Sequence, residues 1–265
     1  MQTMKWELDL NTDWLHPFDA FFSINLLSES SKSICEIGVF KGAYVITVLT
    51  NRPDLKATAI DPCRELESIK KDFMAKVKTL GLDRNVELLD DYKGISREFD
   101  LVHIDGEHTE EAVDKDLKFA KANISRDGLI ILDDIFHTKF IGVISAVFKH
   151  IHQSDLVPFL ITRQKIYMCR KGKYEFFYSR ASNLLHEVNI PHYSNETINI
   201  NKGSIADYDD SCLIKGFPVL LVLEQPKQIQ LSLLGVSSEP ISKISKITRE
   251  LLPPIFSKLL WRLLG

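Results

Sequence analysis

Three aspartates and a histidine stand at the ends of two apolar segments of this 265-residue chain. The segment FDLVHIDGEH places Asp105 and His108 after one apolar run, and RDGLIILDDIFH places Asp133 and Asp134 after another. If the two runs are neighbouring strands of a parallel sheet, the carboxylates converge at one edge. Crowded carboxylates must be protonated, paired with a basic group or bound to a cation, and oxygen ligands select a hard ion such as Mg²⁺.

The same residues also have structural interpretations. Asp133 and Asp134 are of a residue type that often caps the start of a helix, and His108 could form a hydrogen bond within its own loop. An unshifted histidine titrates near pH ~6.5, so His108 would be available as a general base at neutral pH. His137 is the second candidate for the base, whereas His103 stands inside an apolar run and is expected to be structural.

A second group of residues indicates a ligand with positive charge. In ICEIGVFKGAY an apolar run contains Glu36 and is followed by Gly38 and Gly42, and the later run ATAIDPC contains Asp61. Gly38 would allow a tight turn, and Gly42 would let a ligand approach the backbone at the start of the next helix. Dinucleotide-binding loops have three glycines, and Glu36 would place a negative charge beside a phosphate. The pattern favours S-adenosylmethionine, which has an ammonium, a sulfonium and no phosphate, with Asp61 accepting hydrogen bonds from its ribose.

Alternating apolar and amphipathic segments predict the elements that position these residues. Strands are expected at 33–37, 56–60, 85–89, 100–104 and 128–132, and helices at 14–29, 41–51, 64–80, 109–123 and 140–152. Short apolar strands separated by helices predict an α/β fold with a parallel sheet buried on both faces. Segments 156–162 and 165–171 predict an antiparallel hairpin that closes the edge of a seven-stranded sheet.

Changes in residue composition and pattern along the sequence divide the chain into three parts. We predict an N-terminal helical segment at 1–29, a ligand-binding domain at 30–180 and a C-terminal extension at 181–265. The extension contains strand-like segments at 217–224 and 229–234 and ends in an amphipathic helix. Its apolar stripe favours packing on the domain or on a second subunit over a membrane surface, so a homodimer is a reasonable expectation. We expect the extension to serve substrate specificity or dimerisation.

Composition argues against several classes of protein. A formal net charge of −3 without a long basic tract gives no indication of a nucleic-acid partner. A secretion signal and a run of about 18 apolar residues are both missing, so the expected location is cytoplasmic and membrane contact is not expected. Cys35, Cys63, Cys169 and Cys212 lack CxxC spacing and predict neither zinc nor disulfides. The basic residues between Lys165 and Lys173 alternate with Tyr167 and Met168 and look like the rim of a strand.

Four elements together carry a family resemblance. EIGVFKGAY, Asp61, FDLVHIDGEHTEEAVDKDL and RDGLIILDDI resemble the class I S-adenosylmethionine-dependent methyltransferases. Within that class, the chain is most similar to the branch of small-molecule and sugar O-methyltransferases with an IDGxH signature. The resemblance covers roughly residues 30–170. It implies a Rossmann-like, doubly wound fold and methyl transfer to a hydroxyl group of a small-molecule acceptor.

The resemblance also implies roles for individual residues. The methionine part of the cofactor would be lined by Glu36, Gly38 and Gly42, the ribose held by Asp61, and the adenine approached by Asp90 or Asp91. By similarity to enzymes of catechol-O-methyltransferase type, Asp105, Asp133 and Asp134 would ligate Mg²⁺. His108, three residues beyond the first of these ligands, would be the catalytic base, and Asp105 would serve catalysis and cofactor binding as well. Many members of the branch have His-Asp at the position of Asp133 and Asp134, and some need no metal.

Two other functions stay open at the level of the sequence. A nucleotide-dependent oxidoreductase would have a third glycine in the first loop and a Tyr-x-x-x-Lys pair. A non-catalytic binding or scaffold protein with the same fold would bind the cofactor weakly or not at all. Binding of S-adenosylmethionine separates both from a methyltransferase.

Overall fold

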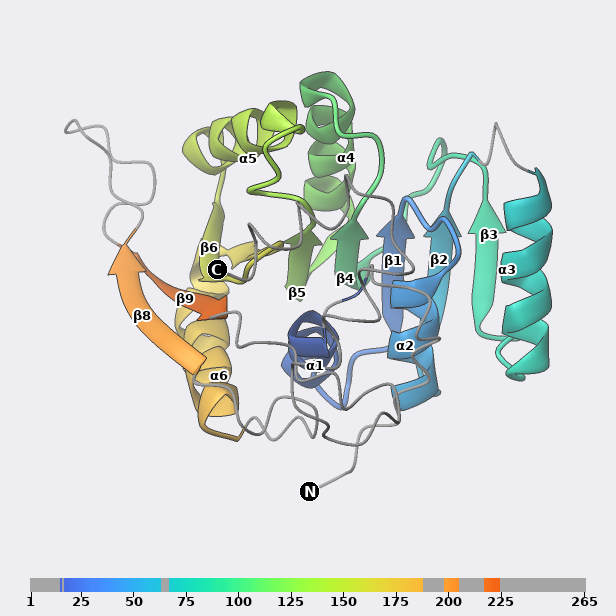
Figure 1. Ribbon diagram of the computed structural model, residues 1–265, viewed down its shortest axis with the longest axis horizontal. Coiled ribbons are helices and arrows are strands. Elements are labelled where there is room, and N and C mark those ends of the chain that lie inside the picture. Colours follow the sequence, from blue (N-terminus) through green and yellow to red (C-terminus); the bar gives the residue numbers. More distant parts are fainter. Residues whose placement is uncertain (1–14, 16, 63–66, 188–197, 205–216, 225–265) are drawn as a thin grey trace, which may run out of the picture. The chain divides into compact units, whose positions relative to one another are not determined.

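The structure, a computed structural model, describes residues 15, 17–62, 67–187, 198–204 and 217–224. In this part of the chain, the nine strands belong to one sheet with the order β3-β2-β1-β4-β5-β7-β6-β9-β8 (Figure 1). The predicted α/β class with a mostly parallel sheet is confirmed, and the sheet continues beyond the seven strands expected.

The parallel strands coincide with the predicted apolar segments. They are β1 (Ser33–Ile37), β2 (Lys56–Ile60), β3 (Val86–Leu89), β4 (Phe99–Ile104) and β5 (Ile124–Leu132). Strand β1 pairs with both β2 and β4, so the strand order reverses between β1 and β4, where ligands of open α/β sheets bind. Strand β5 begins at Ile124 rather than at 128, because it already pairs with Phe99 of β4 before a shift in register.

Helices cover both faces of the sheet. Figure 1 shows α1 (Pro17–Leu26), α2 (Ala43–Asn51) and α6 (Tyr174–Glu187) on one face, and α4 (Glu110–Asn123) and α5 (Ile141–Gln153) on the other. Helix α3 (Glu67–Thr79) lies at the end of the sheet that β3 forms. Burial on both faces explains why the central strands are almost entirely apolar.

The predicted hairpin forms but does not close the sheet. Strand β7 (Ile166–Arg170) lies between β5 and β6 (Leu156–Ile161) and is antiparallel to both. Strand β6 then pairs with β9 (Pro218–Glu224), which pairs with β8 (Ile198–Ser204). Every residue of β6 is buried, as befits an interior strand.

The predicted boundary at 180/181 falls inside α6, and β8 and β9 carry the same sheet into the region predicted as an extension. The strand predicted at 217–224 coincides with β9. The sequence analysis did not predict α6 or β8. The predicted strand at 229–234 and the terminal helix lie outside the described residues.

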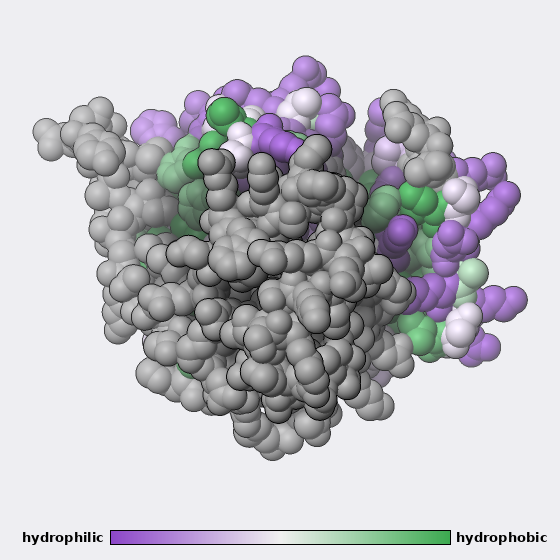
Figure 2. Space-filling view, viewed as in Figure 1, coloured by the Kyte–Doolittle hydropathy of each residue, from purple (hydrophilic) through white to green (hydrophobic). Residues whose placement is uncertain are grey.

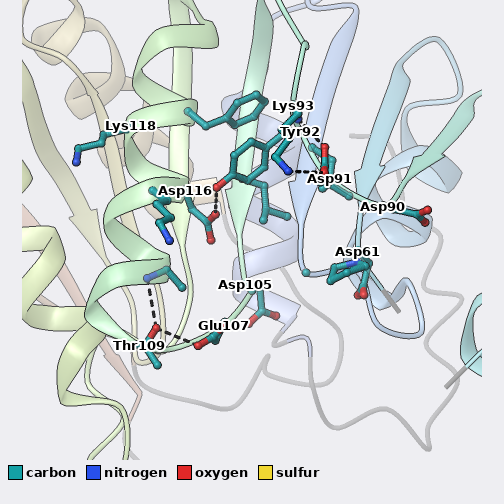
Figure 3. Close-up of a pocket in the computed structure, with 18 of the residues that line it drawn as sticks. Asp61, Asp90, Asp91, Tyr92, Lys93, Asp105, Glu107, Thr109, Asp116 and Lys118 are labelled. Atoms are coloured by element: carbon teal, nitrogen blue, oxygen red, sulfur yellow. Dashed lines mark hydrogen bonds and ion pairs between the residues drawn. The ribbon is translucent and has the colours of Figure 1, made fainter. Parts of the chain in front are cut away.

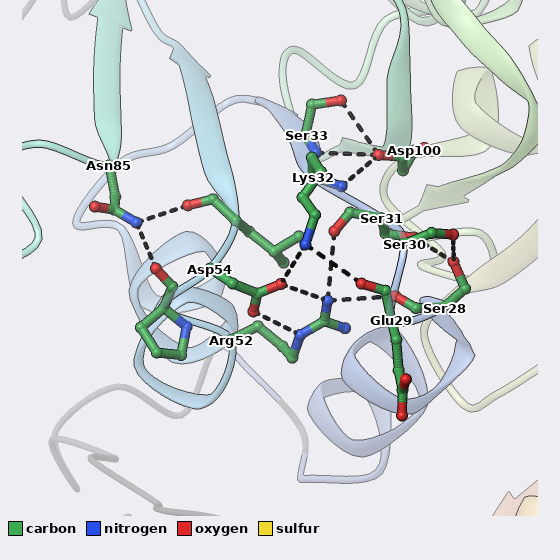
Figure 4. Close-up of polar contacts among 12 residues, drawn as sticks. Ser28, Glu29, Ser30, Ser31, Lys32, Ser33, Arg52, Asp54, Asn85 and Asp100 are labelled. Carbon is green, nitrogen blue, oxygen red and sulfur yellow. Dashed lines mark hydrogen bonds and ion pairs between the residues drawn. The ribbon is translucent and has the colours of Figure 1, made fainter.

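Polar contacts tie together the amino-terminal edge of the sheet (Figure 4). Asp100 Oδ2 accepts hydrogen bonds from the backbone N–H groups of Lys32 at 2.7 Å and Ser33 at 3.1 Å. Arg52 donates to both carboxylate oxygens of Asp54, at 2.9 and 3.0 Å, and this contact lowers the pKa of Asp54. Because these carboxylates already have backbone or cationic partners, this edge is structural.

Hydrophilic side chains are frequent on the visible parts of α3, α4 and α5 (Figure 2). Cys35 and Cys169 are buried and unpaired, and the two other cysteines lie outside the described residues. Within the described ranges, the helices are all too short or too polar to cross a membrane.

Candidate active site

The register of the sheet brings the strand-end residues to one edge. The residue after each of four parallel strands donates its backbone N–H to the neighbouring strand, at 2.8 to 3.0 Å. These residues are Gly38 after β1, Asp61 after β2, Asp105 after β4 and Asp133 after β5. The predicted convergence of strand ends is therefore present in the structure.

A pocket of about 1210 Å³ opens at this edge (Figure 3). Its lining includes most of the residues predicted to bind the cofactor, namely Gly38, Asp61, Asp90, Asp91 and Asp105. Figure 3 shows Asp61, Asp90 and Asp91 along one side of the pocket and Asp105 between Asp61 and Glu107. We call it the larger pocket.

Two residues that the sequence did not indicate, Tyr92 and Asp116, also line the larger pocket. The hydroxyl of Tyr92 donates a hydrogen bond to Asp116 Oδ1 at 3.0 Å, and its ring stacks on Phe119. Burial raises the pKa of Asp116 to about 6. Tyr92 follows the end of β3 in the sequence. Its position after a predicted strand could therefore have indicated that it lies at the site.

Asp61 connects the ends of β1 and β2. Its Oδ2 atom accepts hydrogen bonds from the backbone N–H groups of Val39 at 3.0 Å and Phe40 at 2.8 Å. The carboxylate thereby fixes the loop after β1. Asp90, by contrast, pairs with Lys70 at 2.8 Å.

The two glycines of the first loop have backbone φ angles of 83° and 75°. A Cβ on Gly38 would lie 2.0 Å from the carbonyl oxygen of Asp105, and a Cβ on Gly42 would lie 2.3 Å from the ring of Phe73. Both glycines therefore permit close packing within the protein. The close approach expected for a ligand at Gly42 is made by Phe73 of α3.

A smaller pocket of about 600 Å³ adjoins the larger one. The two pockets share Gly38, Phe40 and Asp105. The smaller pocket is also lined by acidic, basic and aromatic side chains: Glu36, Tyr44, His103, His108, Asp133, Asp134, His137, Phe140 and Lys165. Glu36 and Asp61 thus face adjoining pockets rather than one common cleft.

His108 lies between two carboxylates in the smaller pocket, beside Asp105, which lines both pockets. Its Nε2 atom is 3.1 Å from Asp134 Oδ2 and 3.7 Å from Asp105 Oδ1. Its ring stacks on Phe140 with 4.1 Å between ring centroids. The interaction with Asp105, and then that with Asp134, raises the pKa of His108 to about 9 against the opposing effect of burial. This pKa is higher than the ordinary histidine value that the sequence analysis used for His108.

Asp133 turns away from this cluster. Its Oδ1 atom accepts a hydrogen bond from the backbone N–H of Asp134 at 2.8 Å, and its Oδ2 atom is in contact with Lys165 Nζ. The sequence predicted three aspartates around one ion. The structure instead groups Asp105 and Asp134 with His108, and their nearest ligand atoms all lie within 4.8 Å of one another.

A buried chain of polar contacts links Asp133 to Glu36. Lys165 Nζ donates to His103 Nε2 at 3.1 Å, and His103 Nδ1 lies 3.3 Å from Glu36 Oε1. Glu36 Oε2 also accepts a hydrogen bond from the backbone N–H of Val45 at 3.1 Å. Burial raises the pKa of Glu36 and lowers that of His103, so His103 is neutral and Lys165 carries the positive charge.

Lys165, predicted to lie at the rim of a strand, is only 1% exposed. It precedes β7, which runs antiparallel to β5, so the start of β7 lies at the edge where β5 ends. The antiparallel pairing of β7 with β5 therefore brings Lys165 to the site. The sequence does not show which strand β7 pairs with, so it could not indicate this place for Lys165.

Residues 35–135 match the family model of a methyltransferase domain. This segment is a methyltransferase domain. The predicted class of enzyme is confirmed, and the predicted site residues from Glu36 to Asp134 all fall within the methyltransferase domain. His137, Phe140 and Lys165 lie beyond it in the sequence.

Solved structures of O-methyltransferases are similar to this chain. The O-methyltransferase TomG from Streptomyces achromogenes, involved in tomaymycin synthesis and solved with SAM, is 15% identical, with a TM-score of 0.45, over 59% of this chain and 81% of TomG. An O-methyltransferase from Bacillus cereus in complex with SAH is 12% identical, with a TM-score of 0.46, over 59% of this chain and 82% of its own. No curated protein has a matching sequence. The assignment of the methyltransferase domain rests on the family model.

Proposed function

We propose that the protein transfers a methyl group from S-adenosylmethionine to a hydroxyl group of a small molecule. The observation that carries this proposal is the place of His108, which lies with Asp134 in the smaller pocket and beside Asp105, a residue that lines both pockets. A methyl donor in one pocket and an acceptor in the other would meet beside a proton acceptor.

The larger pocket is the proposed cofactor site. Asp61 and Asp90 or Asp91 lie along its side and would face the ribose and the adenine. The methionine part would lie toward Gly38 and Asp105, with Glu36 behind the loop in the adjoining pocket. Gly42 would contribute by fixing the start of α2 against Phe73 rather than by touching the cofactor.

The smaller pocket is the proposed acceptor site. Methyl transfer to oxygen is an in-line displacement, so much of its rate comes from orienting the two reactants. His108 would remove the proton of the acceptor hydroxyl. Asp105 and Asp134 hold its ring in place and increase its proton affinity. The ring of Phe140 stacks on the imidazole of His108, and His137 also stacks on Phe140.

The residues present also fit a divalent cation. His108 Nε2 is buried without a well-oriented hydrogen bond, between two carboxylates that could share an ion with it. Asp105 and Asp134 would hold the ion beside His108, with Asp133 excluded by its contact with Lys165. A bound Mg²⁺ would supply positive charge that lowers the pKa of a nearby hydroxyl group. His108 serves as the base when the ion is held by the carboxylates alone.

The oxidoreductase alternative meets a structural objection. Tyr167 and Lys171 have the Tyr-x-x-x-Lys spacing, but Tyr167 is buried in β7 and its hydroxyl donates to Asp19 Oδ1 at 2.7 Å. The pair therefore lies away from both pockets.

Calorimetry with S-adenosylhomocysteine and with NAD tests the cofactor. We expect binding of the first and none of the second, and the reverse result would reject the proposal. Release of S-adenosylhomocysteine in the presence of a panel of hydroxyl compounds then tests catalysis and separates the enzyme from a scaffold protein. His108→Gln should lower turnover by about 10²- to 10⁴-fold, the usual contribution of a general base. His152→Gln, an exposed histidine in α5, is the matched control.

Dimerisation and a cytoplasmic location are further proposals. Light scattering of the purified full chain would measure the molar mass, and a monomer at micromolar concentration would reject the homodimer. Fractionation of cells that express the protein would test its location.

A further inference from the structure

The two adjacent aspartates at the end of β5 face different partners. Asp134 has a φ of 56°, in the left-handed region that residues other than glycine seldom adopt. This conformation turns its carboxylate toward His108, at 3.1 Å from Nε2. Asp133 is buried, and both of its oxygens are engaged, one by the backbone N–H of Asp134 and the other by Lys165.

Lys165 is held in place by its own turn. Its backbone N–H donates to Thr162 Oγ1 at 3.1 Å, and its carbonyl oxygen accepts from the N–H of Thr162 at 2.9 Å. The hydroxyl of Thr162 donates to Asp19 of α1 at 2.7 Å. The carbonyl of the preceding Gln164 accepts from Ile135, next to the aspartate pair, at 3.0 Å. The lysine is therefore fixed relative to the end of β5.

The side chain of Lys165 places a positive charge among several aspartate carboxylates. Burial alone lowers its pKa, but the carboxylates of Asp133, Asp19 and Asp105 outweigh that effect and hold the pKa above its ordinary value. A buried ion pair is costly to break, because the remaining partner becomes an uncompensated charge. The carboxylate of Asp133 is therefore held in its contact with Lys165.

We propose that Lys165 is a positioning residue that removes Asp133 from the cation-binding cluster and so leaves Asp105 and Asp134, beside His108, as the carboxylates that hold the cation. This inference deepens the proposed function and rests on it for the presence of a cation. It also explains why two consecutive aspartates at one strand end have different roles.

The first test compares Asp133→Asn with Asp134→Asn in the full-length protein. Asparagine has the same shape as aspartate and tolerates the left-handed conformation at residue 134. The measurement is the affinity for Mn²⁺ alone, from the electron paramagnetic resonance signal of free Mn²⁺. We expect Asp134→Asn to weaken Mn²⁺ binding about 100-fold and Asp133→Asn to change it by less than about threefold. Equal losses in the two variants would overturn the proposal.

The second test removes the lysine. Lys165→Met keeps the length of the side chain and leaves Asp133 uncompensated, so we expect Asp133 to join the cluster and Mn²⁺ affinity to rise about tenfold. The double variant Lys165→Met with Asp133→Asn should return to the wild-type affinity. Unchanged affinity in a folded Lys165→Met variant would overturn the role of the lysine. If that variant does not fold, the comparison of the two asparagine variants decides.

Binding of S-adenosylhomocysteine separates this inference from the proposed function. If the wild type binds S-adenosylhomocysteine but no Mn²⁺ at millimolar concentration, the inference is wrong and the methyltransferase proposal stands. If the wild type binds Mn²⁺ with the expected pattern among the variants but no S-adenosylhomocysteine, the role of Lys165 is supported and the proposed cofactor is wrong.

Discussion

Gly38 packs directly on the backbone of Asp105. A Cβ at Gly38 would lie 2.0 Å from the carbonyl oxygen of Asp105, which no real side chain could accept. Gly38 follows β1 and Asp105 follows β4, so the contact lies at the point where the strand order reverses. Both residues line both pockets, and the boundary between the pockets is therefore partly made of closely packed backbone.

Gly38→Ala should destabilise the protein and weaken cofactor binding together. The substitution combines an unfavourable positive φ with overpacking against β4, so we expect a loss of about 3 kcal/mol in the free energy of unfolding. Urea unfolding and calorimetry with S-adenosylhomocysteine measure the two effects. Gly94→Ala is the control, because Gly94 has a φ of 78° but open space around it. Its loss should be about 1–2 kcal/mol, the cost of the left-handed backbone alone. Equal losses in the two variants would show that the Gly38 contact contributes nothing.

His108 should give the reaction a distinctive pH dependence. Because the pKa of His108 is raised to about 9, the base is mostly protonated at neutral pH, and kcat/KM without divalent cation should rise with pH and level off above about 9. Added Mg²⁺ should move this rise to lower pH, because positive charge near Asp105 and Asp134 offsets their effect on the imidazole. A profile that levels off near 6.5, the ordinary histidine value, would contradict the structure.

The same shift should appear in the stability of the metal-free protein. A folded-state pKa raised from 6.5 to about 9 means that the stabilising contribution of His108 is complete below pH 6.5 and is lost as the pH rises through 9. His108→Gln should remove this part of the pH dependence. Thermal unfolding of both proteins between pH 6 and 10 measures it, and parallel curves would argue against the charged cluster.

Asp61→Asn should affect cofactor binding more than global stability. The carboxylate accepts two backbone hydrogen bonds from the loop after β1, and hydrogen bonds to a charged group are worth roughly 1.5–3 kcal/mol. We expect the affinity for S-adenosylhomocysteine to fall about 10- to 100-fold. Asp54→Asn is the control from the opposite edge of the sheet, where Asp54 pairs with Arg52. It should leave the affinity unchanged, and a comparable loss there would indicate a general effect on folding.

Asp116 should reduce stability as it ionises. Burial raises the folded-state pKa of Asp116 from 3.8 to about 6, so the penalty of its buried charge is absent below pH 3.8 and complete above pH 6. Asp116→Asn retains an oxygen that can accept from Tyr92 and should make the protein relatively more stable at pH 8 than at pH 4. Tyr92→Phe, which loses the hydrogen bond at every pH, should cost about 1 kcal/mol without such a trend. Denaturant unfolding at the two pH values measures both variants.

The sequence alone was sufficient to predict the strand ends that form the site. The segments before Gly38, Asp61 and Asp105 are short and mainly apolar, and they alternate with helical segments, which is typical of buried parallel strands. A parallel sheet places all its carboxyl ends at one edge, so these residues had to lie near one another. The class of the fold followed from this local pattern, and the class of the enzyme followed from the resemblance of four motifs to a known family.

The sequence could not show where the sheet ends. Strand β6 looked like an edge because β9, its second neighbour in the sheet, follows in the chain only after β7 and α6. Its pairing with β9 depends on contacts between residues about sixty positions apart, such as Leu160 and Leu220. Pairing over that distance is decided by packing of the whole sheet rather than by a local pattern.

Only the tertiary structure decided which carboxylate faces which partner at the site. Asp133 and Asp134 are identical in type and adjacent in sequence, yet one contacts Lys165 and the other His108. The difference comes from a left-handed backbone angle at Asp134 and from a buried lysine that reaches β5 through the antiparallel pairing of β7. The direction in which a side chain points and the burial of a charged group are decided by tertiary packing. Both depend on residues that are distant in the sequence and that the fold brings together.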